Sequence, residues 1–108
     1  LDYIMNTIVI RDTKQTTENL AQLRKQIDEY DNSLLEILAS RMRVSEEIGM
    51  YKKEHNMPIL QTGRYDEILQ HRIAQAGQLG MSPEFMKTIF VAIHEESVRH
   101  QMEIMDKK

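Results

Sequence analysis

Between Leu20 and Tyr51, apolar residues recur in alternating steps of three and four positions. They are Leu20, Leu23, Ile27, Tyr30, Leu34, Ile37, Val44, Ile48 and Tyr51. This spacing places them on one face of a single α-helix, and no proline precedes position 58. A helix over about 18–53 would be roughly 50 Å long, which is too long to fold back on itself within 108 residues. Its apolar face therefore has to be covered in part by another chain.

The pattern stops at residues 56–58, Asn-Met-Pro, which predict a break. A second helix is expected over about 63–76, with Thr62 as its N-cap. Gly77 and Gly80 predict its end.

The third helix has a strong start signal in Ser82, Pro83 and Glu84, which supply an N-cap, a proline in the first turn and an acidic residue near the helix N-terminus. We expect it over about 83–105. The fold class predicted is therefore all-α, with three helices in the order long, short, long.

Residues 1–17 differ in character from the rest and are expected to be a linker or docking segment, whereas 18–108 form the domain. Ile8-Val9-Ile10 could be a short strand, and the polar residues 11–17 resemble a linker. The chain begins at Leu1 and its first methionine is Met5, which suggests a piece of a longer polypeptide.

The composition excludes several classes of protein. A chain of 108 residues is one small domain, and its net charge of -3 argues against a nucleic-acid partner. No apolar run could cross a membrane. The absence of cysteine excludes disulfides and thiolate chemistry and suits a cytoplasmic location. A domain this small buries a modest fraction of its surface, so we expect an oligomer.

One charged residue, Arg41, interrupts the apolar face of the long helix. It could extend to water or pair with a carboxylate; alternatively, its planar guanidinium could bind an anion in a cavity. Ser45, Gly49 and Lys52 follow it on nearly the same face. Glycine is costly inside a helix, so Gly49 indicates either close packing or a hollow framed by Arg41 and Lys52.

The third helix carries a comparable polar pair. Its apolar row continues as Ser97 and Gln101, and buried groups of this kind need hydrogen-bond partners. They could bond to backbone or to each other, or they could contact a ligand. A metal site is not expected, because His94 is followed by Val98 where a zinc-binding helix would have its second histidine. No nucleotide-binding or hydrolase motif is present, and no cofactor is expected.

Several motifs that are separated along the chain together form a pattern specific to one protein family. They are LRKQID at 23–28, LLEILASRM at 34–42, IGMYKKE at 48–54, Pro58-Ile59, Arg64 and EESVRHQ at 95–101. With these motifs, the chain from about 19 to 106 resembles the all-helical chorismate mutases. The resemblance implies an intertwined homodimer with two equivalent active sites, which converts chorismate to prephenate in aromatic amino-acid biosynthesis.

The resemblance also implies roles for individual residues. Arg24 and Arg41 would pair with the two carboxylates of chorismate, and Ser97 would help to hold the ring carboxylate. Lys52 and Gln101 would be the catalytic pair, both contacting the ether oxygen. The remaining substrate-binding positions are Gln61, through its backbone, and Arg64, at the far wall.

Helix geometry adds one detail independently. Arg24 would lie about 25 Å along the helix from Arg41, so both could contact one small ligand only if Arg24 comes from the partner chain. The chemistry needs no general base, because the rearrangement is unimolecular and moves no proton. It needs a site that holds the reactive conformation and stabilises negative charge on the ether oxygen.

Two positions depart from the usual family pattern. Gln61 replaces a common loop acid, and Tyr65 replaces a glutamate that often contacts the ring hydroxyl. Two alternatives therefore stay open: an isochorismate-pyruvate lyase of the same fold, and a weakly catalytic dimerisation or regulatory domain of a fused synthase. The segment 1–17 resembles the linker to a 3-deoxy-7-phosphoheptulonate synthase found in some bacterial fusions.

Overall fold

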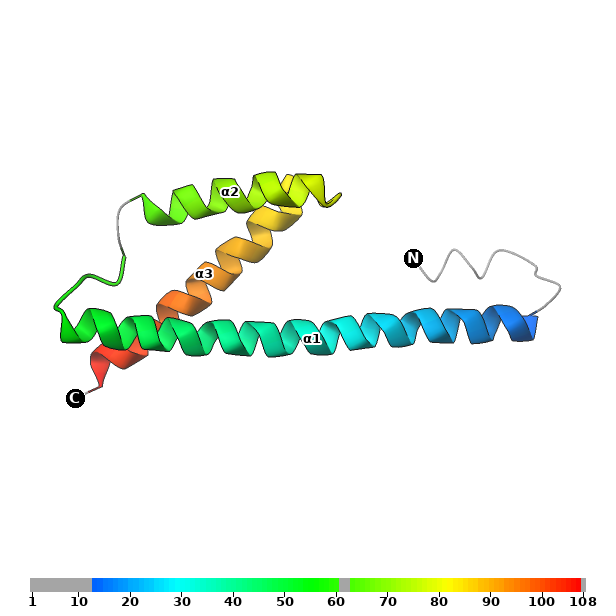
Figure 1. Ribbon diagram of the computed structural model, residues 1–108, viewed down its shortest axis with the longest axis horizontal. Coiled ribbons are helices and arrows are strands. Elements are labelled where there is room, and N and C mark those ends of the chain that lie inside the picture. The colour runs from blue at the N-terminus through cyan, green and yellow to red at the C-terminus, as the bar shows by residue number, and fades with distance from the viewer. Residues whose placement is uncertain (1–12, 61–62, 108) are drawn as a thin grey trace. The chain divides into compact units, whose positions relative to one another are not determined.

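The computed structural model describes residues 13–60 and 63–107 of the chain. This described part contains three α-helices, α1 (Thr13–Glu54), α2 (Arg64–Gln78) and α3 (Pro83–Asp106), and no strand. Helix α1 runs through two compact units, of which the first ends at Ile37 and the second begins at Leu38 (Figure 1). The all-α class and the order long, short, long are confirmed.

The first helix starts earlier than predicted. It begins at Thr13 instead of about 18, so residues 13–17 are helical. That residues 1–17 form a linker or docking segment stays a prediction. The amide nitrogen of Gln15 donates to Oδ1 of Asn19, 3.0 Å away and one helical turn later. Polar residues can extend a helix in this way without an apolar face, which hides the extension from a search for periodicity. The expected strand at Ile8-Val9-Ile10 lies outside the described residues.

The end of α1 is where the sequence predicts it. Asn56 has a positive φ of 54°, a conformation that asparagine tolerates better than most residues. The backbone N–H of Met57 then donates to the carbonyl of Lys52 at 2.8 Å. This contact closes the last turn of the helix, and Pro58 prevents its continuation.

Helix α2 is slightly longer at its C-terminus than predicted. Gly77 lies inside the helix rather than beyond its end. The chain turns at Gly80, whose φ of 83° is easy for glycine, and the N–H of Met81 donates to the carbonyl of Ala76 at 3.1 Å. At the other end Gly63 precedes the helix, and the expected N-cap, Thr62, lies outside the described residues.

Helix α3 begins as predicted. The Ser82 hydroxyl accepts a hydrogen bond from the backbone N–H of Phe85 at 3.2 Å, and Pro83 occupies the first turn. This cap satisfies one of the N–H groups that a helix start leaves without a partner. The helix continues to Asp106, one residue beyond the expected end.

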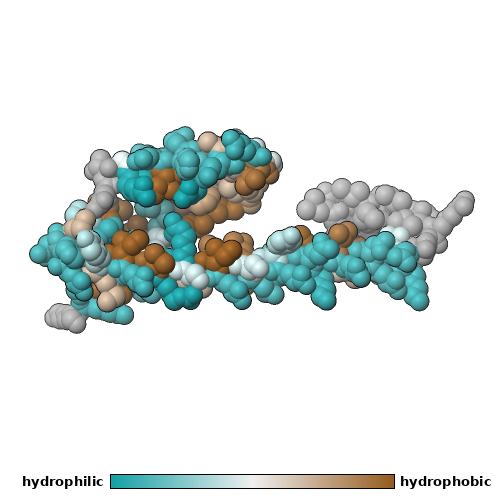
Figure 2. Space-filling view, viewed as in Figure 1, coloured by the Kyte–Doolittle hydropathy of each residue, from teal (hydrophilic) through white to brown (hydrophobic). Residues whose placement is uncertain are grey.

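Few apolar side chains are buried in the described part of the chain. Leu69 and Ala76 of α2 and Met86 of α3 are the buried apolar residues there. By contrast, the apolar face of α1 is open to solvent in the single chain, with Ile27 59% and Tyr30 73% exposed. Figure 2 shows such apolar side chains at the surface of the long helix. Among the described residues, no helix is both long and apolar enough to cross a membrane.

Candidate active site

Polar side chains are buried where α3 lies against the second half of α1. Ser45, Ser97 and Gln101 are buried, and every buried polar side-chain atom in the described residues has a hydrogen-bond partner. Burying a polar group costs free energy unless a hydrogen bond compensates it, so such groups are uncommon in a simple core. A small domain that buries as many polar as apolar side chains is therefore more typical of a functional site than of a simple core.

Beside these residues is a cavity of about 430 Å³, within the second unit. It lies among α1, α2, α3 and the loop that joins α1 to α2. Its apolar lining is Val44, Ile48, Ile59, Leu60, Ile68 and Val98. Its polar lining is Arg41, Ser45, Lys52, Arg64, Tyr65, His94, Ser97 and Gln101. The volume suits a small organic ligand.

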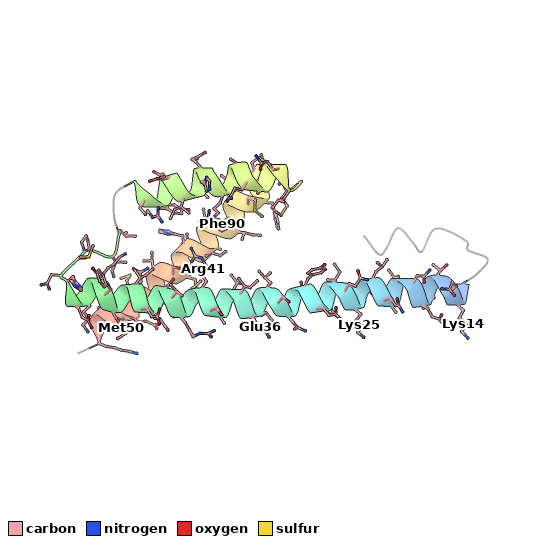
Figure 3. All side chains as sticks on the ribbon, viewed as in Figure 1. Lys14, Lys25, Glu36, Arg41, Met50 and Phe90 are labelled. Carbon is pink, nitrogen blue, oxygen red and sulfur yellow. The ribbon has the colours of Figure 1, made fainter. Side chains whose placement is uncertain are left out.

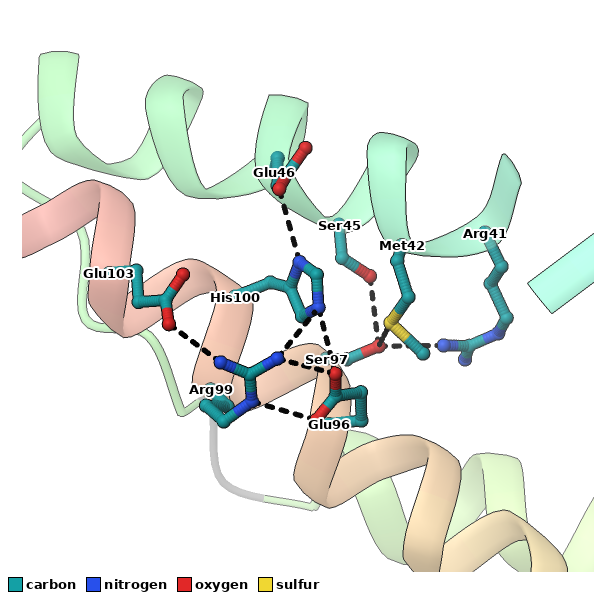
Figure 4. Close-up of polar contacts among 9 residues, drawn as sticks. All are labelled: Arg41, Met42, Ser45, Glu46, Glu96, Ser97, Arg99, His100 and Glu103. Atoms are coloured by element: carbon teal, nitrogen blue, oxygen red, sulfur yellow. Dashed lines mark hydrogen bonds and ion pairs between the residues drawn. The ribbon is translucent and has the colours of Figure 1, made fainter. Parts of the chain in front are cut away.

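At one end of the cavity, Arg41 contacts Ser97. Nη1 of Arg41 donates to the Ser97 hydroxyl at 2.7 Å, and the hydroxyl of Ser45 lies 2.8 Å from the same oxygen (Figure 4). Figure 3 labels Arg41 on the stretch of α1 that belongs to the second unit. The guanidinium is therefore held by one of its donors, and its others are available for an anion.

At the other end, Lys52 joins α1 to both the loop and α3. Its Nζ donates to the backbone carbonyl of Ile59 at 2.5 Å and to Oε1 of Gln101 at 3.0 Å. An ammonium can only donate, so this contact fixes the orientation of the Gln101 amide. The NH₂ of Gln101 is then the group that can donate to a ligand.

Gly49 explains how α3 comes so close to α1. A Cβ added there would lie 3.1 Å from the Cα of Gln101 and 3.4 Å from its Cβ. Of the two explanations that the sequence left open, close packing therefore applies directly. The same close approach also places Gln101 beside Lys52. The packing of α3 against α1 at Gly49 and the formation of the site therefore have the same cause.

The cavity is electropositive. Arg41, Lys52 and Arg64 line it, and no carboxylate does so among the described residues. Burial lowers the pKa of Lys52, while burial and then the charge of Arg72 lower the pKa of Arg41. In both groups burial disfavours the charged form, and no carboxylate among the described lining residues offsets this effect. The arrangement is therefore suited to bind an anionic ligand.

A second polar wall is formed by Tyr65 of α2 and His94 of α3. Their rings stack with centroids 3.9 Å apart and an interplanar angle of 19°. The pKa of His94 is lowered, chiefly by burial and then by Arg41, with Lys52 contributing less; Glu95 opposes the shift. Sequence reasoning considered His94 only as a metal ligand and missed its place here. The signal was present, because positions 94, 97 and 101 share one face of α3.

The site residues predicted from the sequence are thus only partly brought together. Arg41, Lys52, Arg64, Ser97 and Gln101 all line the cavity. Arg24 lies on α1 in the first unit and is not part of the lining. Gln61 lies outside the described residues. The carbonyl of Ile59 was missed, since a backbone acceptor leaves no mark in the sequence.

A second polar cluster links α1 and α3 on another side of Ser97 (Figure 4). Nδ1 of His100 lies 3.1 Å from a carboxylate oxygen of Glu46, and its Nε2 lies 2.9 Å from one of Glu96. Arg99 forms ion pairs with Glu96 and Glu103, both at 2.6 Å. In the described part of the chain, no group of three or more His, Cys, Asp or Glu residues is placed to hold a metal ion. Because His100 of α3 contacts Glu46 of α1, the cluster acts as a clamp between the two helices.

Comparison with known proteins gives a family match over most of the chain. The family described as chorismate mutase type II matches residues 23–102. A 4-amino-4-deoxychorismate mutase of Streptomyces pristinaespiralis is 30% identical over 83 residues, which are 77% of this chain and 64% of that protein. A second protein of that name, from Streptomyces venezuelae, is 26% identical over 89 residues, 82% of this chain and 86% of that protein.

Another relative is a T-protein of Enterobacter agglomerans. It is 33% identical over 78 residues, which are 72% of this chain but 21% of the T-protein. The chain thus spans just under two thirds of the first Streptomyces relative and about a fifth of the T-protein. Every predicted site residue except Gln61 and Arg24 has now been placed in the cavity, and all eight polar lining residues fall inside the matched range.

Proposed function

The chain belongs to the chorismate mutase type II family, and from this premise we propose that its cavity binds chorismate and converts it to prephenate, an isomerisation. The observation that carries the proposal is the lining itself. Lys52 and Gln101 are held 3.0 Å apart in a cavity that Arg41 also lines, and the described lining contains no carboxylate. A dianion with an ether oxygen fits this set of donors and cations.

We propose the following roles for the residues. Arg41 pairs with one carboxylate of the substrate, and Ser97 helps to hold it. Lys52 and Gln101 donate to the ether oxygen, where negative charge develops as the carbon–oxygen bond breaks. Donors already fixed at that position stabilise the transition state without reorganisation. The contacts of Lys52 with Ile59 and Gln101 support such preorganisation.

The reaction explains why no nucleophile or general base is needed. Bonds break and form within one molecule, and no proton is transferred. The protein must bind the substrate in its reactive conformation, in which the two reacting carbons are close. A cavity with cations at Arg41, Lys52 and Arg64 and an apolar remainder is suited to hold such a compact dianion. No cofactor enters this proposal.

We further propose an intertwined homodimer in which Arg24 of one chain completes the cavity of the other. Two observations support it. The apolar face of α1 is exposed in a single chain, with Leu23 57% and Ile37 63% exposed, and Arg24 does not line the cavity of its own chain. Gln61, through its backbone, and Arg64 complete the proposed binding residues. A cytoplasmic location and an association with a 3-deoxy-7-phosphoheptulonate synthase stay predictions.

The test is to follow chorismate decay with the purified chain and to identify the product. Formation of prephenate at ordinary enzymatic rates supports the proposal and excludes a merely regulatory domain. Supplying isochorismate and measuring pyruvate tests the lyase alternative. If the chain, at concentrations where it is oligomeric, leaves chorismate unchanged, the proposed mutase activity is wrong.

A further inference from the structure

The stacked pair of Tyr65 and His94 has no role in the reaction proposed above. Both rings line the cavity, with centroids 3.9 Å apart. His94 lies one helical turn before Ser97 on α3, and Tyr65 follows Arg64 at the start of α2. Arg41, Ser97, Lys52 and Gln101 are assigned to a carboxylate and the ether oxygen, and the hydroxyl of Ser45 lies 2.8 Å from that of Ser97. Tyr65 and His94 are the uncharged polar residues of the lining that then remain. With the second carboxylate assigned to Arg24 of the other chain, the polar part of chorismate that remains is its ring hydroxyl.

The charge at this wall is the second observation. Burial, the largest cause, and the nearby Arg41 and Lys52 hold the pKa of His94 below its ordinary value of 6.5, against the opposing effect of Glu95. Glu95 is exposed and does not line the cavity. A histidine with a pKa below 6.5 is mostly neutral near pH 7, so the imidazole is neutral there in the chain without ligand.

From this juxtaposition, and resting on the proposed mutase function, we infer that Tyr65 and His94 form a specificity wall that accepts a ring hydroxyl and disfavours an ammonium group at the same ring position. The distinction matters because two relatives are named for a substrate with an amine at that position. The inference assigns this chain to the hydroxyl-bearing substrate.

The physical reason lies in hydrogen bonding and charge. A neutral imidazole has one donor and one acceptor, and a phenol hydroxyl can do either, so both groups match a hydroxyl. An aliphatic amine is mostly protonated near pH 7 and would bring a positive charge beside Arg41 and Lys52. No carboxylate among the described lining residues compensates that charge. Like charges placed together in a binding site are a strong source of discrimination.

The experiment measures kcat/KM for chorismate and for 4-amino-4-deoxychorismate near pH 7, with prephenate or its amino counterpart as the identified product. The wild-type chain should prefer chorismate by at least about tenfold. His94→Glu introduces a carboxylate at the wall and should shift the ratio of the two kcat/KM values toward the amine by at least about tenfold. His94→Gln, which is neutral, should shift it far less.

His71→Glu is the matched control, because it makes the same substitution at an exposed position of α2 outside the cavity lining. It should leave the ratio unchanged. Tyr65→Glu replaces the other ring of the pair with a carboxylate side chain. It takes the place of His94→Glu in the test if that variant does not fold, as judged by circular dichroism. Its ratio of the two kcat/KM values should shift in the same direction.

Two failures are distinguishable. A wild-type chain that converts chorismate but prefers the amine, or carboxylate variants whose ratio equals that of His71→Glu, would overturn the specificity wall and leave the mutase function standing. A wild-type chain that converts neither compound would overturn the proposed function, and this inference with it.

Discussion

The ammonium of Lys52 and the amide oxygen of Gln101 lie 3.0 Å apart and join the last turn of α1 to α3. This contact orients both groups at once. Lys52 is fixed by two acceptors, and the Gln101 amide is turned so that its NH₂ is the available donor. A pair of donors that hold each other in place needs no rearrangement when charge develops on a ligand.

Lys52→Ala should lower kcat/KM for chorismate by about 100- to 1,000-fold, because it removes one transition-state donor and releases Gln101. The measurement is chorismate decay, with circular dichroism to verify helicity. Lys53→Ala is the matched control. It removes the same charge one position away, where Nζ donates to the carbonyls of Ile104 and Lys107. Equal activities of the two variants would contradict the role of Lys52.

Ser97→Ala should raise KM for chorismate by about tenfold, since the Arg41 guanidinium loses the acceptor that holds it. It should also lower the free energy of unfolding by about 1–3 kcal/mol, because the buried Ser45 hydroxyl loses its partner. Ser40→Ala, which removes an exposed hydroxyl that accepts from Arg43, should change neither quantity. A normal KM in Ser97→Ala would mean that Arg41 is positioned without it.

Gly49→Ala should destabilise the protein by about 1–3 kcal/mol and reduce kcat, because its Cβ would meet the Gln101 backbone at 3.1 Å and displace the amide. Gly77→Ala should have the opposite effect on stability. That glycine lies inside α2 with open space around it, so alanine should stabilise the helix by about 0.5–1 kcal/mol. Urea unfolding and chorismate decay measure both effects. Two variants of equal stability would rule out the close approach at Gly49.

Mixing inactive variants tests whether Arg24 acts across the proposed dimer. After joint unfolding and refolding of equal amounts of Arg24→Ala and Lys52→Ala, half of the dimers are mixed, and each contains one intact site. Activity should return to about a quarter of that of the wild type. A mixture of Lys52→Ala with Gln101→Ala should recover none, because both residues line the cavity of one chain. Recovery in neither mixture would show that Arg24 does not complete the site of the other chain.

The clamp around His100 predicts a pH dependence of stability. Contacts with Glu46 and then Glu96 raise the pKa of His100 above 6.5, so the contribution of the protonated ring to the free energy of unfolding is complete below pH 6.5 and is lost as the pH rises through the raised pKa. Contacts with Arg99 and then His100 lower the pKa of Glu96 from 4.5 to about 2. Its contribution is present above pH 4.5 and is lost as the pH falls toward about 2.

His100→Gln should therefore lower the urea midpoint more at about pH 5.5 than at about pH 8.5, at a fixed chain concentration. His71→Gln is the control, since His71 is exposed on α2 and should give equal midpoints relative to the wild type at both values. A deficit in His100→Gln that does not depend on pH would show that the ring stabilises by packing and not by its charge.

Much of the fold could be predicted because its signals are local. The spacing of apolar residues indicates α1, and Ser82 with Pro83 marks the start of α3, since a cap depends on neighbouring residues. The first turns of α1 could not be found in this way. Residues 13–17 lack apolar side chains, so a search for apolar periodicity does not detect them, although they are helical and Gln15 contacts Asn19 one turn later.

Among the polar residues that line the cavity, some could likewise be predicted from the sequence and others could not. Arg41, Ser97 and Gln101 stand out because each interrupts an apolar row. His94 does not stand out as part of a cavity, because its stacking with Tyr65 joins two helices that are separate in the sequence. The burial that keeps its ring neutral is likewise a property of the packed helices. Both features depend on the tertiary structure.

The contact of Lys52 with the carbonyl of Ile59 has a consequence for how such a domain can evolve. A backbone acceptor is supplied by any amino acid, so the contact survives substitution at position 59 but not a change in the number of residues between the helix end and the loop. Selection at this point would act on insertions and deletions more than on residue type. Among descendants of this chain, we expect the loop between α1 and α2 to keep its length while its sequence varies.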